Sequence, residues 1–199
     1  MTKLCLYFLL ATSCVLAQKK WTIAEAESFQ VELNKQYADS KESPLEAEDL
    51  KIFKTLDFFS INEKFVVEAR LEKSKNEKAF KMKTSTTRLP EYIKYGELHF
   101  VLDGKELHLN VYQNVDLIKK AGFEDYLFLP FSDLTSGKES YIGGRYIDLR
   151  IPKSSTITID FNTAYNPYCA YNHAYSCPIV PLENDLVIAI EAGVKKFHD

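Results

Sequence analysis

The period of the hydrophobic pattern changes near residue 58 of this 199-residue chain. Before that point, apolar residues recur three or four positions apart, at Ala26, Phe29, Leu33 and Tyr37. This spacing predicts an amphipathic helix. Thr22–Glu25 has the form of a capping box at its start, with Trp21 placed to pack against the first turn. A second capping box, Ser43–Glu46, has proline at the first helical position and predicts a short helix that ends near Phe53.

After residue 58, apolar residues alternate with polar ones, which is the pattern of half-buried β-strands. The alternating runs lie at residues 65–71, 98–102, 107–111, 157–161 and 186–190. Asp103-Gly104 separates two of these runs by two residues, which is the strongest short signal for a β-hairpin. The register that follows sets His99 opposite His108 and Phe100 opposite Leu107.

Short alternating runs with turn signals between them predict a mainly β fold, an antiparallel β-barrel or sandwich with an N-terminal α-helical extension. We expect a signal peptide at residues 1–17, the helical extension at 18–57 and the β-domain at 58–199. Residues 18–199 are then long enough to bury one core as a single globular domain.

The first 17 residues are organised like a secretory signal peptide. Lys3 gives a positive start, residues 4–10 are apolar, and Val15 and Ala17 occupy the −3 and −1 positions of a cleavage site. The apolar run is too short to span a bilayer. We therefore expect an exported protein, periplasmic or secreted, that is cleaved after Ala17 and has no stable membrane span. The alternative is a lipoprotein modified at Cys14, although the residues before this cysteine form a poor lipobox.

The charge of the chain argues against nucleic acid as a partner. The formal net charge is −3, and it becomes −4 when Lys3 leaves with the signal peptide. Nucleic-acid binding needs a basic face, which this composition does not indicate. Ser136-Gly137-Lys138 matches a phosphate-binding loop only in part, because Ser132 stands where the first glycine belongs. No complete motif indicates a cofactor or a metal, and we expect neither.

Residues 160–184 have the most unusual composition in the chain. They hold four of the twelve tyrosines and three of the seven prolines, but no lysine, arginine or glycine. Tyrosine rings give contact area with a polar tip, and prolines fix the backbone around them. We therefore expect a pocket wall with stacking tyrosines and hydrogen-bonding asparagines, which suits a sugar or another small polar ligand. The predicted binding residues are Tyr165, Tyr168, Tyr171, Tyr175, Asn162, Asn166, Asn172 and Glu183.

Two basic residues outside this segment complete the predicted binding site. Arg145 follows Gly143-Gly144, a backbone that a ligand can approach closely. Together with Lys138, Arg145 could hold an anion or add charge selectivity to the pocket. The alternative is a glycine-rich connection with a surface salt bridge.

Cys169 and Cys177 are the only cysteines that remain after signal-peptide removal. In an exported protein, we expect such a pair to form a disulfide, which would hold Tyr171 and Tyr175 in place. Two alternatives stay open. Both thiolates could bind a metal with His173 between them, or one cysteine could be a nucleophile activated by His173.

Two further pairs of polar residues could carry chemistry. Asp160 and Glu183 could act as paired carboxylates, or either one could act with His173, as the acid–base groups of a hydrolase, although Asp160 could equally cap the backbone of the loop that follows it. His99 and His108 lie opposite each other in the predicted hairpin and could share a metal. An exposed polar strand face is the simpler interpretation of these histidines.

A series of short motifs runs through the second half of the chain. These are the segments at residues 127–131, 135–139, 144–146, 160–162, 164–170, 175–178, 183–184 and 192–193. In order and spacing they resemble domain-of-unknown-function family 1684, a set of uncharacterised bacterial and archaeal proteins, over about residues 43–197. Val194 departs from the glutamate that is common in the family.

The resemblance implies no activity, but it bears on the two cysteines. Family members that lack a signal peptide carry the same pair, and a disulfide would not persist in a reducing compartment. The resemblance therefore adds weight to a metal-binding or reactive-thiol role. Our overall expectation is an exported module that binds a small polar ligand. A hydrolase-type enzyme and a structural or partner-binding protein are the alternatives.

Overall fold

The computed structural model describes residues 21–198, so the predicted signal peptide lies outside the described residues. Two helices, α1 (Ile23–Ala38) and α2 (Ala47–Ile52), precede the strands. The strands are β1 (Val66–Lys73), β2 (Phe80–Lys81), β3 (Glu91–Leu102), β4 (Lys105–Asn114), β5 (Tyr126–Phe131), β6 (Arg145–Arg150) and β7 (Thr156–Asp160). Short 3₁₀ turns lie at Glu63–Phe65, Leu117–Lys119, Phe161–Thr163, Tyr168–Ala170 and Leu182–Asn184.

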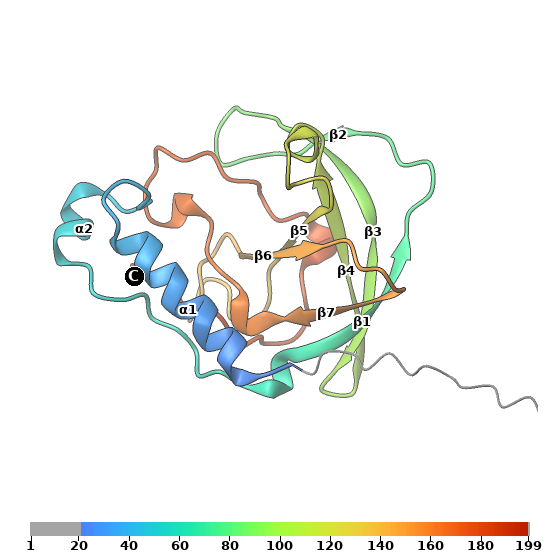
Figure 1. The fold of residues 1–199 in the computed structure, drawn as a ribbon, viewed down its shortest axis with the longest axis horizontal. Coiled ribbons are helices and arrows are strands. Elements are labelled where there is room, and N and C mark those ends of the chain that lie inside the picture. The colour runs from blue at the N-terminus through green and yellow to red at the C-terminus, as the bar shows by residue number, and fades with distance from the viewer. Residues whose placement is uncertain (1–20, 199) are drawn as a thin grey trace, which may run out of the picture.

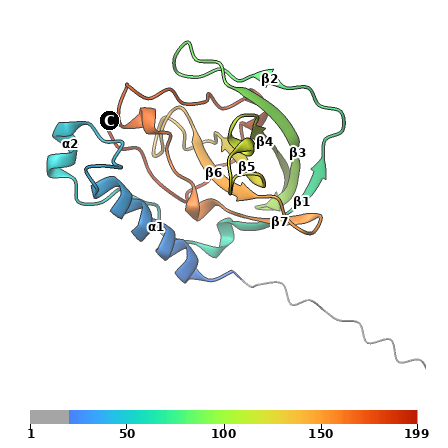
Figure 2. The same ribbon diagram turned by 45° about the horizontal axis from the view of Figure 1, so that its top comes forward.

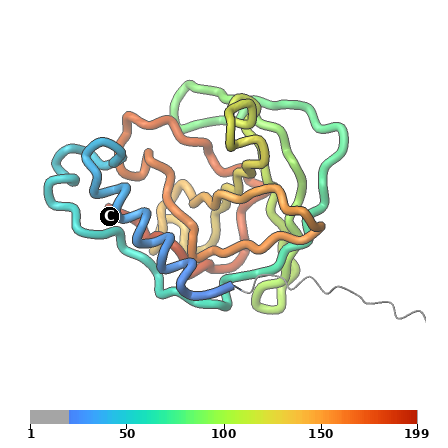
Figure 3. Tube along the Cα trace, viewed as in Figure 1, coloured from blue at the N-terminus to red at the C-terminus, as the bar shows by residue number. Residues whose placement is uncertain are grey.

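The strands form one antiparallel sheet in the order β6-β5-β4-β3-β1-β7, and β2 pairs with β3. The sheet curls into a half-barrel, and α1 lies along one side of it, beside the chain that follows β7 (Figures 1 and 2). This arrangement confirms the predicted mainly β fold with an N-terminal helix. The tube in Figure 3 shows the C-terminal end beside the loop that joins α1 to α2 and beside α2 itself. His198 and Asp49 of α2 make a 3.2 Å contact there.

The β3–β4 hairpin has the predicted turn and register. Asp103 and Gly104 have φ angles of 52° and 70°, as a two-residue primed turn requires. Phe100 pairs with Leu107, and His99 pairs with His108. The alternating pattern and the Asp103-Gly104 turn therefore predicted the pairing of β3 with β4 correctly.

One face of the sheet covers the main hydrophobic core, and the alternating runs supply it. The buried residues of β1, β3, β4 and β7 include Val67, Ala69, Leu71, Leu98, Phe100, Leu102, Leu109, Val111, Ile157 and Ile159. In the last alternating run, residues 186–190, Leu186, Ile188 and Ile190 are also buried, but the run is not a strand. Its backbone instead bonds to the segment after β5, where Leu186 donates to Ser132 O at 2.8 Å and Leu134 donates to Ile188 O at 3.0 Å.

The pattern of alternation did not indicate β5, because both faces of this strand are covered. In β5, Leu127, Leu129 and Phe131 face the main core, while Phe128 belongs to a second cluster on the opposite face. A strand buried on both faces is apolar throughout and has no period of two. The opposite face of β3–β6 forms one side of a pocket.

A β-bulge in β3 places Tyr92 on that opposite face. The pairing between β3 and β4 shifts between Lys94 and Gly96. One extra residue reverses the direction of every side chain beyond it. Tyr92 therefore joins Tyr112 in the second cluster, although its number has the same parity as that of the core residue Leu98. Gly96 is needed at this bulge, because an added Cβ would lie 2.5 Å from Glu72 O.

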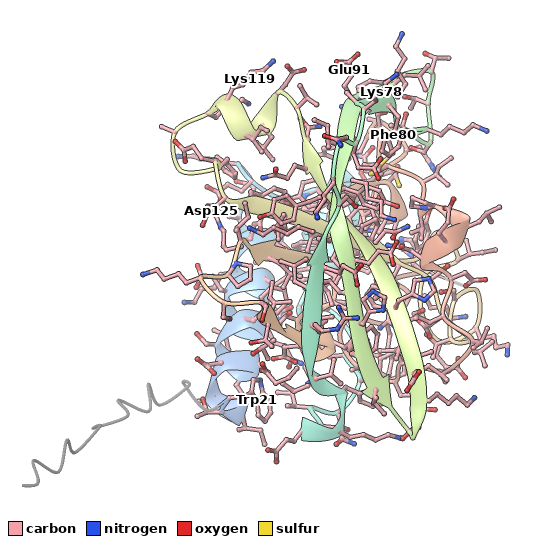
Figure 4. All side chains as sticks on the ribbon, turned by 90° about the vertical axis from the view of Figure 1, so that its right-hand side faces the viewer. Trp21, Lys78, Phe80, Glu91, Lys119 and Asp125 are labelled. Carbon is pink, nitrogen blue, oxygen red and sulfur yellow. The ribbon has the colours of Figure 1, made fainter. Side chains whose placement is uncertain are left out.

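The first helix begins as expected but is anchored differently. The Glu25 carboxylate accepts a 3.2 Å hydrogen bond from the Thr22 backbone N–H, and the helix starts at Ile23. Trp21 was expected to pack against the first turn. Its indole N–H instead donates to Asp160 Oδ2 at 2.7 Å and ties α1 to the end of β7. Figure 4 shows Trp21 at the start of α1.

The second helix ends where expected but begins later. Ser43 accepts a hydrogen bond from the Leu45 N–H, and α2 then runs from Ala47 to Ile52. Among residues 21–198, no helix is long and apolar enough to cross a bilayer.

Candidate functional site

A pocket of about 500 Å³ lies between α1, the opposite face of β3–β6 and the segment that follows Tyr165. We call it the tyrosine pocket. Its sheet side is formed by rings from three strands: Tyr92 of β3, Tyr126 and Phe128 of β5, and Tyr146 of β6. Phe128 and Tyr146 meet edge to face with ring centroids 4.7 Å apart. Such packing gives a stiff apolar floor.

Helix α1 and the tyrosine-rich segment form the other walls. Phe29, Leu33 and Gln36 follow one another at helical spacing and line the pocket from α1. Tyr168 and Tyr175 line it from the segment, and their ring centroids are 5.2 Å apart. The helix and the segment are joined by a 2.7 Å hydrogen bond from Gln36 Nε2 to Tyr168 Oη.

Asp148 of β6 is the one charged residue among the described residues that line the tyrosine pocket. It pairs with Phe128 across β5 and β6 and projects on the pocket face. Its Oδ1 accepts hydrogen bonds from Tyr126 Oη at 2.6 Å and from Tyr165 Oη at 2.7 Å. Its Oδ2 has no hydrogen-bond partner among residues 21–198, and the side chain is exposed. The hydroxyls of Tyr126 and Tyr165 therefore orient the Asp148 carboxylate through Oδ1, and Oδ2 can accept a hydrogen bond from a ligand.

Four of the six phenol hydroxyls in the lining bond to the protein itself. Tyr126 and Tyr165 donate to Asp148, Tyr146 donates to the Pro178 carbonyl, and Tyr168 accepts from Gln36. Burial raises the pKa of Tyr126 and that of Tyr165, and the negative charge of Asp148 raises both further. These tyrosines therefore stay protonated as donors, and they present mainly ring surface to the cavity.

The structure brings three of the predicted binding residues into the pocket and leaves the others out. Tyr165, Tyr168 and Tyr175 line it. Tyr171 is instead buried against Tyr37 of α1, with ring centroids 4.9 Å apart, and packs against the C-terminal segment.

The asparagines have backbone roles. Asn162 Nδ2 donates to Asn62 O and to Asp160 Oδ1, and Asn166 Nδ2 donates to Lys195 O and to the Tyr171 hydroxyl. Asn172 Oδ1 accepts from the Ala174 N–H within a turn. Glu183 is exposed on a 3₁₀ turn and does not line the pocket. None of these three asparagines lines the pocket, so the side chains predicted to bond to a sugar do not face the cavity.

Arg145 and Lys138 do not converge on an anion site. Arg145 is fully buried on the core side of β6, where Nη2 donates to Asp133 Oδ2 and to Ile190 O, each at 2.8 Å. Desolvation lowers the pKa of Arg145, while the paired Asp133 opposes this shift. Lys138 is exposed on a separate loop. The predicted anion site is not formed because the Arg145 side chain lies on the face of β6 that is turned to the core. There the buried carboxylate of Asp133 compensates its charge.

The expected disulfide between Cys169 and Cys177 is not formed, and both residues are free thiols. The Cys169 backbone N–H donates to Cys177 Sγ at 3.1 Å. Hydrogen bonding from the Cys177 thiol lowers the pKa of Cys169 to about 6, and Tyr141 and Ser85 contribute in the same direction. The same interaction raises the pKa of Cys177, whose side chain lines the pocket. Cys169 is therefore the thiol of the pair that ionises first, and the thiolate is the reactive form of cysteine.

With this geometry established, the chain can be compared with known proteins. A family model described as "Protein of unknown function (DUF1684)" matches residues 51–195. The chain belongs to this family. The matched region contains the sheet side of the tyrosine pocket and the segment with the two cysteines, whereas α1 lies outside it.

A solved structure of similar fold also has no assigned function. The solution NMR structure of an uncharacterised protein from Haloarcula marismortui is 32% identical to this DUF1684 protein. It covers 86% of this chain and 92% of its own, with a TM-score of 0.68. No curated protein matches the chain.

The remaining candidate groups of this DUF1684 protein are not assembled as a catalytic site. Asp160 accepts from Trp21 and from the Asn162 N–H, so it has the capping role that the sequence allowed. His173 is exposed, and neither it nor Glu183 lines the tyrosine pocket. The His99 and His108 rings are 6.0 Å apart. Within the described part of the chain, no group of three or more His, Cys, Asp or Glu residues is placed to hold a metal.

Sequence reasoning missed the sheet side of the pocket. Tyr126 and Phe128 come from β5, which is buried on both faces, and Tyr146 and Asp148 come from β6, which was not among the predicted strands. One signal was available. Tyr146 and Asp148 are two positions apart in a short β run, so they must project on the same face.

Proposed function

We propose that this protein binds a small organic molecule in the tyrosine pocket. The observation that carries the proposal is the cavity itself, whose volume of about 500 Å³ falls in the range of small-molecule sites. Aromatic walls around a few polar groups are the usual composition of such sites. Three of the predicted tyrosines support this interpretation, although the absence of the asparagines from the lining argues against a sugar.

A matched pair of substitutions on α1 tests the proposal. Phe29→Ser removes a ring from the pocket, whereas Val31→Ser changes the same helix at an exposed position outside the lining. A fragment library is screened by ligand-observed NMR against the native protein, and each hit is then titrated into both variants. We expect hits whose affinity falls about tenfold or more in Phe29→Ser, as loss of a well-packed aromatic contact implies. Hits that bind both variants equally would place binding elsewhere and contradict the proposal.

A second candidate function is thiol chemistry at Cys169. The lowered pKa of this cysteine favours it, because thiolates are the reactive form. Cys177 connects the thiol pair to the pocket, so a bound molecule and a reactive sulfur would be neighbours. The pH dependence of Cys169 alkylation, described in the Discussion, tests the first requirement of this function.

We also propose that the protein is exported through residues 1–17. The charged start, the short apolar run and the Val15/Ala17 cleavage site support this. N-terminal sequencing of the native protein should find Gln18 first, and a product that begins at Met1 would contradict export.

A further inference from the structure

We propose that the ligand of the tyrosine pocket is a small organic cation, such as an alkylated ammonium or guanidinium group on an apolar body. This inference rests on the proposed function and specifies the ligand class. It follows from two features of the lining, namely a lone carboxylate with a free oxygen and ring faces whose hydroxyls are already engaged.

The charge of the lining is negative and unmatched. Asp148 forms no ion pair among residues 21–198, and its Oδ2 accepts no hydrogen bond there. Two arginines contact lining residues, but neither pairs with Asp148. Arg150 pairs with Asp125 at 2.7 Å, and Arg88 donates to Ser176 O at 2.7 Å and to Ser176 Oγ at 3.2 Å. A cation is therefore the ligand group that would complete the site.

The ring surfaces favour the same class. The hydroxyls of Tyr126, Tyr146, Tyr165 and Tyr168 are bonded to the protein. Arg150 already lies over the Tyr126 ring, with its Cζ 5.9 Å from the ring centroid, so the other rings of the lining supply the aromatic surface for a ligand. An aromatic face attracts a cation through its quadrupole, most strongly when the site is partly desolvated. A sugar, by contrast, needs free donors and acceptors, and an anion would meet both Asp148 and the negative ring faces.

The volume indicates that the cation carries an apolar body. A cavity of about 500 Å³ exceeds what a bare ammonium group fills. Phe29 and Leu33 line the α1 side, opposite the strand residues, and offer apolar contact to that body.

Four probes separate the possibilities. Benzyltrimethylammonium, benzyl alcohol and benzoate share an aromatic body and differ in charge, and methyl β-glucoside represents a sugar. Each is titrated into the native protein by NMR or calorimetry at low salt. We expect benzyltrimethylammonium to bind at least about tenfold more tightly than benzyl alcohol, and benzoate to bind most weakly of the three aromatic probes.

Two aspartate substitutions with the same change of net charge locate the effect. Asp148→Asn keeps the shape of the side chain and an acceptor for the two phenols, but removes the charge. Asp103→Asn makes the identical change in the exposed β3–β4 turn, where asparagine before glycine is well tolerated. We expect Asp148→Asn to weaken benzyltrimethylammonium binding about tenfold or more, as loss of a charged interaction implies, and Asp103→Asn to leave it unchanged.

The possible failures are distinguishable. If benzyl alcohol binds as tightly as the cation and Phe29→Ser weakens both, the pocket binds small molecules but the cation inference is wrong. Tightest binding of benzoate or of the glucoside would also overturn the inference while the pocket survives. If no probe or library fragment depends on Phe29, the proposed function itself fails. The comparison among probes uses the native protein, so it remains decisive even if Asp148→Asn does not fold.

Discussion

An aspartate lies on each side of the β5–β6 pair, Asp133 just after β5 and Asp148 within β6, and the two differ in burial and in their hydrogen bonds. On the core side, Asp133 is buried: its Oδ1 accepts from the Thr135 and Ile190 N–H groups at 2.8 and 3.1 Å, and its Oδ2 accepts from Arg145. On the pocket side, Asp148 is exposed, receives two phenols on Oδ1 and leaves Oδ2 free. Both oxygens of Asp133 have partners in the protein, so its role is structural. Asp148 is oriented through Oδ1, and its Oδ2 is available to a ligand.

The largest expected effect is the difference in unfolding free energy when each of the two carboxylates is removed. Asp133→Ala leaves Arg145 buried without its counter-charge, which should cost about 3–5 kcal/mol of unfolding free energy. Asp148→Ala loses hydrogen bonds at an exposed site, and should cost about 1 kcal/mol. Urea unfolding at neutral pH measures both values. Equal losses would mean that Asp148 also has a structural role, and would weaken its assignment to a ligand.

The bulge at Gly96 should have the next largest effect, because it decides which face Tyr92 occupies. A methyl group at this position would lie 2.5 Å from Glu72 O, so β1 and β3 must move apart. Gly96→Ala should therefore lower the unfolding free energy by about 1–3 kcal/mol, the usual range for overpacking. It should also weaken any ligand that contacts Tyr92. Val101→Ala on the same strand is exposed and should change stability by less than about 0.5 kcal/mol. A Gly96→Ala protein as stable as this control would show that the bulge tolerates a side chain.

The two faces also explain how much of the molecule could be predicted from the sequence. On the core face, residues such as Leu98 and Leu109 alternate with polar neighbours, so the hairpin register and the fold class were predictable. On the pocket face, Phe128 lies on β5, whose two faces are both buried, so no period of two separates them. Asp148 lies on the short strand β6, which was not among the predicted strands. The bulge at Gly96 then changed the parity of Tyr92 in a way that spacing alone could not reveal.

The tyrosine-rich segment was recognised by its composition but not by its orientation. Tyr165, Tyr168 and Tyr175 reach the pocket, while Tyr171 and Asn166 turn to the core that is formed with α1 and the C-terminal segment. A series of 3₁₀ turns has no simple side-chain period. Which residues face the cavity is therefore decided by tertiary contacts, such as the hydrogen bond between Gln36 and Tyr168.

The smallest expected effect concerns the two cysteines on the pocket side. The pH dependence of Cys169 alkylation measures thiol reactivity and leaves the fold unchanged. With its pKa lowered to about 6, Cys169 should be about 90% thiolate at pH 7, whereas an ordinary thiol of pKa about 8.5 is a few per cent thiolate. Its alkylation rate with iodoacetamide should therefore rise between pH 5 and 7 and then level off. Peptide mass spectrometry of the quenched reaction follows Cys169 separately from the other cysteines.

The Cys177→Ala variant identifies the cause of this reactivity. Without the thiol that donates to Cys169, the pKa of Cys169 should return toward its ordinary value, and the midpoint of the alkylation profile should move upward in pH. A His173→Ala variant serves as the control, because His173 is exposed and is not among the groups that lower this pKa. Its profile should match that of the native protein. A native profile that rises through pH 8.5, or one that depends on His173 and not on Cys177, would contradict a pKa of Cys169 that is lowered by Cys177.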